Sequence, residues 1–462
     1  MPDIFIEGGT VITLDKERRI IKDGAIAIEK DRIIDVGKTS ELKDKYVGDV
    51  VIDATSMIVM PGLIDCHVHL AQAMLRGCAD DLDLIHWLAD RIWPLQGNYT
   101  EEDGRVSAEL CILEMIKSGT TAFVETMIHT RYGFDGIAEV VEKSGIRAAL
   151  AKTIMDRPSY STAEGVMHPG MVETQESLDE AVRLFHKWHG KADGRIMVWF
   201  GPRTVGGCSP ELYREIGEKA RELGTGVTIH HSEVKENIEY TLREFGMYPT
   251  YFMKEVGLLG PNVLLVHSVW VRDDEIRLMA ETRTNACHCP AAAMKCALGY
   301  PPVVKMLEAG VAVGLGCDGG PSNNTYDMIR EMRLACLLQK IHSMDPKALP
   351  AETVLEMATL HGARVLGMEK ELGSIEVGKK ADIILIDTKR PHMTPVHNPV
   401  SNVVYSACGE DVHTVIIDGK IVMRDRKVLT LDEERIIAEA RERGAEVVRR
   451  AKVDVSPRWP VI

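Results

Sequence analysis

The sequence predicts an α/β protein in which a TIM-like (β/α)8 barrel carries a small β-sandwich built from both ends of the chain. Eight apolar, strand-like runs alternate with helical stretches in the middle of the sequence. Segments that alternate apolar and polar residues flank this region on both sides. The length of 462 residues suits a barrel of roughly 250–350 residues with a satellite domain.

The two ends of the chain share a residue pattern typical of β-strands. Residues 1–57 alternate apolar and polar positions with period two, and the same texture returns over residues 370–430, as in "DIFIEGGTVITLD" and "VHTVIIDGKIVMRDRK". We expect these ranges to form the two parts of one sandwich, which also keeps the chain ends close together. Residues 431–462 predict a charged helix followed by an extended tail.

Residues 58–369 carry the barrel pattern. Buried parallel strands read as nearly continuous apolar runs, and eight such runs are "GLIDCHVHL", "TTAFVETM", "RAALAKTIM", "RIMVWFGPR", "GVTIHHSE", "NVLLVHSVW", "RTNACHCP" and "AVGLGCDGG". The stretches between them place apolar residues at helical spacing and often end in glycine, as in "SPELYREIGEKARELG". Eight such units favour a closed barrel over a doubly wound sheet.

Composition excludes several classes of partner. The net charge of −14 argues against nucleic acid or an anionic membrane, since both reward a basic surface. The N-terminus does not resemble a signal peptide, and no apolar stretch reaches the ~20 residues that span a bilayer. The ten cysteines are scattered, which predicts reduced thiols and a cytoplasmic protein.

The first barrel strand ends in two histidines. His67 and His69 in "DCHVHL" are two residues apart, so their side chains leave a strand on the same face. Active sites of such barrels lie where the strands end. A pair of histidines alone is a weak signal, because isolated histidines are common in cores and on surfaces.

Further imidazoles and carboxylates follow other strands of the barrel. The fifth strand ends in "HHSE" with His230, His231 and Glu233, the sixth ends at His267, and the eighth ends at Asp318. A site for one divalent ion needs three or four nitrogen or oxygen ligands and an open position. Together with the first pair, these residues predict a metal centre. Spacing alone does not choose between His230 and His231.

These motifs, taken in order, resemble those of the amidohydrolase superfamily. The matching segments are "PGLIDCHVHL", "HHSE", "LLVHSVW", "GLGCDGG" and the closing "GSIEVGKKADIILID". The resemblance covers nearly the whole chain. It is strongest to the branch of deaminases and chlorohydrolases that act on nitrogen heterocycles, which includes melamine, S-adenosylhomocysteine and guanine deaminases and atrazine chlorohydrolase.

The resemblance implies roles for individual residues. It implies that four residues hold one divalent ion: His67, His69, His230 and Asp318. It selects His230 over His231 because, in the family, the histidine ligand lies three residues before the glutamate, which is Glu233 here. Glu233 and His267, together with Asp318, would move protons. The fourth strand end, "WFGPRTV", has no lysine of the kind that binuclear relatives carboxylate, so one ion is expected. Zinc is the first choice and Fe²⁺ the alternative.

The reaction that the resemblance implies is hydrolytic deamination of an amino-substituted ring, which releases ammonia. A bound metal ion lowers the pKa of a coordinated water to ~7, which makes hydroxide available for this reaction at neutral pH. By family position, the residues expected to line the substrate pocket are Gln72, Trp87, Trp93, Gln96, Arg203 and Ser322. The nucleoside-deaminating relatives resemble "WPLE" and "GPHxPYT", whereas this chain has Gln96 and Arg203 at the corresponding places.

These two departures favour a free ring, such as an s-triazine, purine, pyrimidine or pterin. Two alternatives remain open. One is a nucleoside deaminase of the S-adenosylhomocysteine or 5'-methylthioadenosine type, and the other is a hydrolytic dehalogenase of triazines. The expected partner is a small heterocyclic molecule, and the resemblance also implies a homo-oligomer.

Overall fold

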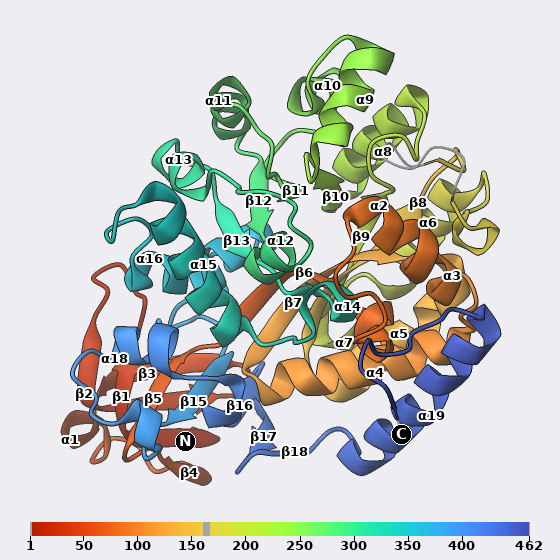
Figure 1. Cartoon of the computed structure of the whole chain (residues 1–462). Helices are drawn as coiled ribbons and strands as arrows, with labels where there is room; N and C mark the ends of the chain where they lie inside the picture. The colour runs from red at the N-terminus through yellow and green to blue at the C-terminus, as the bar shows by residue number, and fades with distance from the viewer. Residues whose placement is uncertain (1, 160–166, 462) are drawn as a thin grey trace.

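A computed structural model describes residues 2–159 and 167–461. Its central feature is a ring of parallel strands (Figure 1). Seven of the eight predicted apolar runs each contain one of these strands, and the eighth run contains two short ones. The strands are β6 (Leu63–His69), β7 (Thr120–Ile128), β8 (Arg147–Ile154), β9 (Ile196–Pro202), β10 (Val227–His231), β11 (Val263–His267), β12 (Asn285–His288) and the short pair β13 (Val313–Leu315) and β14 (Asp318–Gly319).

The last strand closes the barrel. β13 pairs in parallel with β12, where Leu315 lies opposite His288. After two residues the chain continues as β14, which pairs in parallel with β6, where Gly319 lies opposite His69. The eighth strand therefore joins the seventh to the first, and the predicted TIM-like barrel is confirmed.

Helices follow the strands and cover the outside of the barrel. The longer ones are α4 (Glu101–Lys117), α5 (Phe134–Ser144), α6 (Ser177–Trp188), α8 (Pro210–Leu223), α9 (Lys235–Phe245), α11 (Asp273–Thr282) and α15 (Met328–Ser343). Their ends follow local rules. The Ser209 side chain caps α8 by accepting a hydrogen bond from the Leu212 N–H, and Gly224 ends that helix with a positive φ of 66°.

Strands from both chain ends form a second sheet, seen at the lower left of Figure 1. Its strands are β1 (Ile4–Ile12), β2 (Ile20–Glu29), β3 (Arg32–Lys38), β4 (Val50–Asp53), β5 (Met57–Pro61), β15 (Ile383–Asp387), β16 (Val412–Ile417), β17 (Lys420–Arg424) and β18 (Lys427–Val428). β5 joins the two groups, since it pairs with β1 and β15. The two ends thus share one mixed sheet. The domain boundaries assigned from the sequence stay predictions.

The C-terminal helix α19 (Glu433–Ala451) lies along α4, as Figure 1 shows. Arg435 forms an ion pair with Glu109 of α4, with 2.9 Å between Nη2 and Oε1.

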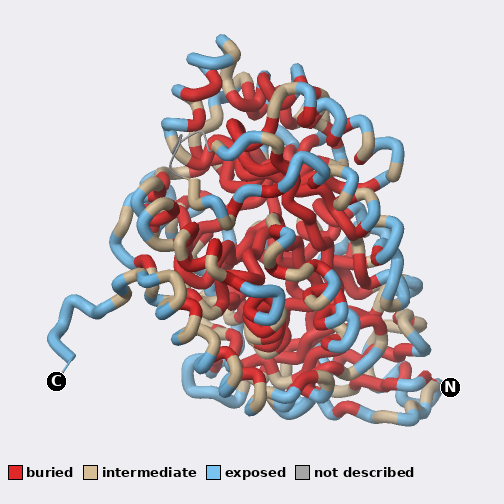
Figure 2. Tube along the Cα trace, turned by 90° about the vertical axis from the view of Figure 1, so that its right-hand side faces the viewer, coloured by how far each residue is buried: buried red, intermediate tan, exposed pale blue. Residues whose placement is uncertain are grey.

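Figure 2 shows that the buried chain is concentrated in the barrel interior and between the barrel and its helices. All ten cysteines are free thiols. No helix among the described residues is long and apolar enough to cross a membrane.

Candidate active site

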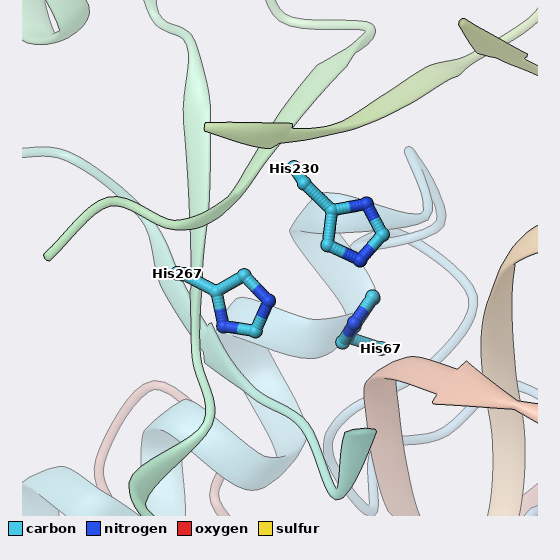
Figure 3. A group of neighbouring side chains, drawn as sticks. All are labelled: His67, His230 and His267. Carbon is cyan, nitrogen blue, oxygen red and sulfur yellow. The ribbon is translucent and has the colours of Figure 1, made fainter. Parts of the chain in front are cut away.

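The strand ends bring five ionisable side chains to one place. His67 and His69 from β6, His230 from β10, His267 from β11 and Asp318 from β14 are all buried. The Asp318 Oδ1 atom lies 3.3 Å from the Nε2 atoms of both His67 and His69. The Nε2 atoms of His69 and His230 are also 3.3 Å apart. Figure 3 shows three of the imidazoles, from three different strands, facing a common centre.

This group, which we call the metal cluster, fits a divalent ion. The ligand atoms of His67, His230 and His267 lie within 4.8 Å of one another, and so do those of His67, His69 and Asp318. The buried His67 Nε2 atom lies 3.3 Å from Asp318 Oδ1 but forms no hydrogen bond with any described residue. Buried polar atoms usually form hydrogen bonds, so a metal ion at this point would satisfy the nitrogen. Imidazole and carboxylate are ligands that zinc and iron both accept.

The electrostatics of the cluster favour a cation. Burial lowers the pKa of His230 well below its usual value and that of His267 to about 3, which leaves both rings neutral. Burial alone would raise the pKa of Asp318, but its contacts with His67 and His69 hold it well below its usual value. Burial opposes protonation of His69 as well, yet Asp318 and Glu125 raise its pKa to about 9. The two carboxylates thus stabilise a positive charge here, whether a proton or a metal ion.

The neighbouring histidine, His231, points elsewhere. Its Nδ1 atom lies 3.1 Å from the Ser268 hydroxyl, and its Nε2 atom lies 3.2 Å from the Thr250 hydroxyl. Consecutive residues of a strand face opposite sides, so β10 can present only one of the pair to the barrel centre. The structure places His230 there, in agreement with the choice made by resemblance.

Two members of the cluster have a strained backbone. The φ angles are 69° at His267 and 67° at Asp318, in the left-handed region that residues with a side chain seldom adopt. Such a conformation costs of order 1–3 kcal/mol and persists where the surrounding structure imposes it. His267 is the last residue of β11 and Asp318 is the first residue of β14, so the strain lies at strand boundaries beside the cluster.

A carboxylate and a hydroxyl group of β7 support the histidines of the cluster. Glu125 of β7 lies beside His69, with 3.8 Å between Oε1 and Nδ1, and accepts hydrogen bonds from the Leu70 and Met127 N–H groups. The Nδ1 atom of His67 contacts the Thr126 hydroxyl. Groups of this kind fix the orientation of ligand rings and tune their basicity.

A cavity opens above the cluster. It is lined by His69, His230, Glu233, His267 and Asp318, and by all six residues expected in the pocket: Gln72, Trp87, Trp93, Gln96, Arg203 and Ser322. His267 Nε2 lies 3.7 Å from Glu233 Oε1, so the two groups expected to move protons are neighbours.

Two of the pocket residues also shape the turn after Asp318. The Ser322 hydroxyl both accepts from the Gly319 N–H, at 3.0 Å, and donates to its carbonyl, at 3.1 Å. A Cβ atom on Gly319 would lie 1.7 Å from Gln72 Oε1, so a larger residue at this position would displace the Gln72 amide.

Sequence reasoning missed one wall of the cavity. Glu125, Met127 and His129 follow one another at alternate positions along and just after β7, and Tyr132 comes shortly afterwards. The signal was present as period-two spacing at the end of the second barrel strand, "VETMIHT". These residues carry no motif, and His129 on its own looks like an ordinary buried histidine.

The chain matches the amidohydrolase family over residues 58–422. It belongs to this family. It is 39% identical, over 97% of its length and 100% of the relative's, to a 5-methylthioadenosine/S-adenosylhomocysteine deaminase of Pelotomaculum thermopropionicum. It is 40% identical to a 5'-deoxyadenosine deaminase of Methanosarcina acetivorans, covering 98% of this chain and 100% of that one.

A solved structure of an adenosine deaminase from Xanthomonas campestris with bound zinc is also similar. The two share 30% of their residues, with a TM-score of 0.90 over 97% of this chain and 99% of the other. Family membership, the metal cluster and these relatives together make this amidohydrolase a metal-dependent deaminase that acts on C–N bonds of amino-substituted heterocycles.

Proposed function

We propose that this amidohydrolase deaminates the adenine ring of a nucleoside of the 5'-deoxyadenosine, 5'-methylthioadenosine or S-adenosylhomocysteine type. The observation that carries the proposal is the similarity of 39–40% to deaminases of these nucleosides over almost the whole of each chain. The sequence alone favours a free ring, on the basis of Gln96 and Arg203. Two substitutions weigh less than similarity that extends over the entire barrel and the second sheet.

The cavity wall supports a nucleoside. The amides of Gln72 and Gln96 lie side by side, with 3.5 Å between Nε2 of the first and Oε1 of the second. Together they offer donors and acceptors that suit the hydroxyl groups of a sugar. Leu84, Leu88 and Met171 line other parts of the same cavity and suit an apolar 5' group, such as a deoxy carbon or a thioether.

We infer that His67, His69, His230 and Asp318 hold one divalent ion, with zinc as first choice and iron as alternative. An ion held there would supply an acidified water, with its pKa lowered toward ~7. The roles inferred for the chain's own groups concern protons. Glu233 delivers a proton to the ring nitrogen beside the carbon under attack, and His267 and Asp318 orient and deprotonate the attacking water. The reaction exchanges the exocyclic amine for oxygen and releases ammonia.

A substrate panel tests the proposal. Metal-loaded protein is incubated with 5'-deoxyadenosine, 5'-methylthioadenosine, S-adenosylhomocysteine, adenine, guanine, melamine and a pterin, and ammonia is measured. We expect kcat/KM for at least one of the nucleosides to exceed that for every free ring by tenfold or more. Ammonia released from free rings alone would reject the nucleoside proposal and would support a free-ring substrate, as Gln96 and Arg203 suggest.

Substitution of Gln96 sharpens this test. Gln96→Glu converts a neutral acceptor into a charged one, and hydrogen bonds to charged groups are about 1 kcal/mol stronger. We expect kcat/KM for the preferred nucleoside to rise by roughly fivefold, while turnover of any free base stays unchanged because it has no sugar hydroxyls. An equal change for both kinds of substrate would place Gln96 away from the sugar.

The role of Glu233 is tested by Glu233→Gln. Loss of a positioned proton donor lowers kcat by about 10²–10⁴-fold, and we expect metal content to be unaffected. Glu236→Gln, three residues further along at an exposed position, is the matched control. A Glu233→Gln enzyme of normal kcat would exclude the proposed proton transfer.

The homo-oligomer and the cytoplasmic location stay predictions. Light scattering on the purified chain measures the first directly.

A further inference from the structure

A second group of potential metal ligands lies outside the barrel. It is formed by His392 in the short helix η6 (Pro391–Met393), Cys408, and Asp411 in the short helix η8 (Gly409–Asp411). Their ligand atoms all lie within 4.8 Å of one another. The His392 Nε2 atom is 2.8 Å from Asp411 Oδ2, and the Cys408 Sγ atom is 3.4 Å from the same oxygen. The sequence shows no motif here, because 19 residues separate the histidine from the aspartate.

The group is preorganised around one oxygen atom. The Asp411 side chain is 3% exposed, and its Oδ2 atom also accepts a hydrogen bond of 2.9 Å from the Cys408 N–H. The Gly409 N–H donates to Asp327 at the start of α15, which fixes the η8 turn against the barrel helices. The His392 side chain is 47% exposed. The base of the group is therefore rigid and buried, while its open side faces water.

We propose that His392, Cys408 and Asp411 form a second metal site, suited to Zn²⁺ and separate from the metal cluster of the barrel. One imidazole nitrogen, one thiolate sulfur and one carboxylate oxygen are a donor set that zinc accepts, and a water molecule can take the fourth tetrahedral position. On binding, the Cys408 thiol releases its proton to solvent. The His392 proton moves to Nδ1 so that the Nε2 lone pair faces the ion.

The site would act on the structure rather than on the substrate. It would tie η6 to η8 across the segment between them, and the Asp327 contact would extend this link to α15. An ion that binds only the folded chain stabilises it in proportion to its affinity. We therefore expect a higher thermal midpoint when the second site is filled, with no change in the chemistry of the barrel centre.

Cobalt distinguishes the two sites, because a thiolate bound to Co²⁺ absorbs in the near ultraviolet by charge transfer, whereas imidazole and carboxylate ligands do not give this band. The full chain is stripped with a chelator and titrated with Co²⁺. We expect two equivalents per chain and a charge-transfer band that develops with one of them. Cys408→Ser should remove the band and reduce binding to one equivalent, with deaminase activity retained.

Cys78→Ser is the matched control, since Cys78 and Cys408 are the two cysteines that are only partly buried. It should keep the band and both equivalents. His392→Ala changes a half-exposed side chain and provides a second variant, expected to weaken binding of the second ion by at least tenfold. Binding of a single equivalent by the original chain, or a band that survives Cys408→Ser, would overturn the proposal.

Discussion

Two groups of buried ionisable side chains lie around the barrel strands, and they balance their charges in different ways. One is the metal cluster. The other, which we call the lysine cluster, consists of His129 after β7, Lys152 of β8 and Glu173, and it lies beside the same cavity, which His129 lines. Both contain histidine and carboxylate, and both are almost fully buried.

The lysine cluster contains its own cation. The Lys152 ammonium donates to Glu173 Oε2 at 3.0 Å and to the Thr153 carbonyl at 2.8 Å. His129 Nδ1 lies 2.9 Å from the other Glu173 oxygen. Burial alone would raise the pKa of Glu173, but His129, Lys152 and a Thr130 hydrogen bond hold it well below its usual value. The Lys152 ammonium therefore neutralises the Glu173 carboxylate, although neither ring nitrogen of His129 makes a hydrogen bond to a described residue.

The metal cluster contains no lysine or arginine, so its positive charge comes from a proton on His69, whose pKa is raised to about 9, or from a metal ion. Its imidazole nitrogens approach one another and Asp318 at 3.3 Å, and burial keeps His230 and His267 neutral. Neutral nitrogen atoms at this distance gain little from each other unless an ion lies between them. The two clusters therefore differ in two respects: only the lysine cluster contains an ammonium group, and only the metal cluster gathers several imidazoles around one point.

The largest expected effect comes from breaking the metal cluster. His230→Ala removes one ligand, and we expect the bound metal and the deaminase activity to be lost together. His231→Ala, at the adjacent buried residue, should retain the metal because its ring bonds to Ser268 and Thr250. Elemental analysis and ammonia release measure both. Loss of metal from the His231 variant alone would reverse the assignment.

Much of this arrangement could be predicted from the sequence, because it depends on local periodicity. Eight apolar runs fix the strands, and the barrel topology carries each strand end to the same rim, so His67, His69, His267 and Asp318 were expected together. The resemblance added His230, a choice that spacing could not make between two consecutive histidines.

The supporting residues could not be predicted, because their partners are distant in the sequence and carry no pattern. Glu173 reaches Lys152 from a loop 21 residues away. Glu125 sits inside an apolar run, where nothing marks it as the neighbour of His69. Gln96 and Arg203 line the cavity, and their contact with substrate stays a prediction. These two residues favour a free ring, whereas the overall similarity supports a nucleoside.

A smaller effect is expected from breaking the lysine cluster. Lys152→Met leaves the Glu173 carboxylate buried without its main cation, which costs about 3–5 kcal/mol of stability at neutral pH. We expect a lower thermal midpoint with metal content unchanged. Lys187→Met, which removes an exposed pair with Asp135, is the control and should cost less than about 1 kcal/mol.

The stability deficit of Lys152→Met is expected to depend on pH. In the folded chain the pKa of Glu173 is lowered, so its ionisation stabilises the protein above the unfolded pKa of about 4.3, and that stability is lost as the pH falls through the folded value. Without Lys152 the folded pKa rises. The deficit of the variant should therefore shrink as the medium is acidified toward pH 4, and a deficit independent of pH would mean that Lys152 acts through packing alone.

The smallest effect is expected beneath the metal cluster, at Glu125. Glu125→Gln keeps the shape of the side chain and removes the negative charge beside His69, but its single oxygen can accept from only one of the Leu70 and Met127 N–H groups, which now bond to Oε2 and Oε1. Loss of such a supporting carboxylate lowers metal affinity by about 10–100-fold. Competition with a chromogenic chelator should show this weaker binding at an unchanged stoichiometry of one ion in the barrel.

Glu173→Gln completes the comparison, because it neutralises a carboxylate of the other cluster. It should lower stability and leave the affinity for the ion as it is. If both variants bound the metal equally well, the charge of Glu125 would not contribute to holding the cation, and Asp318 alone would supply the negative charge that distinguishes this cluster from its neighbour.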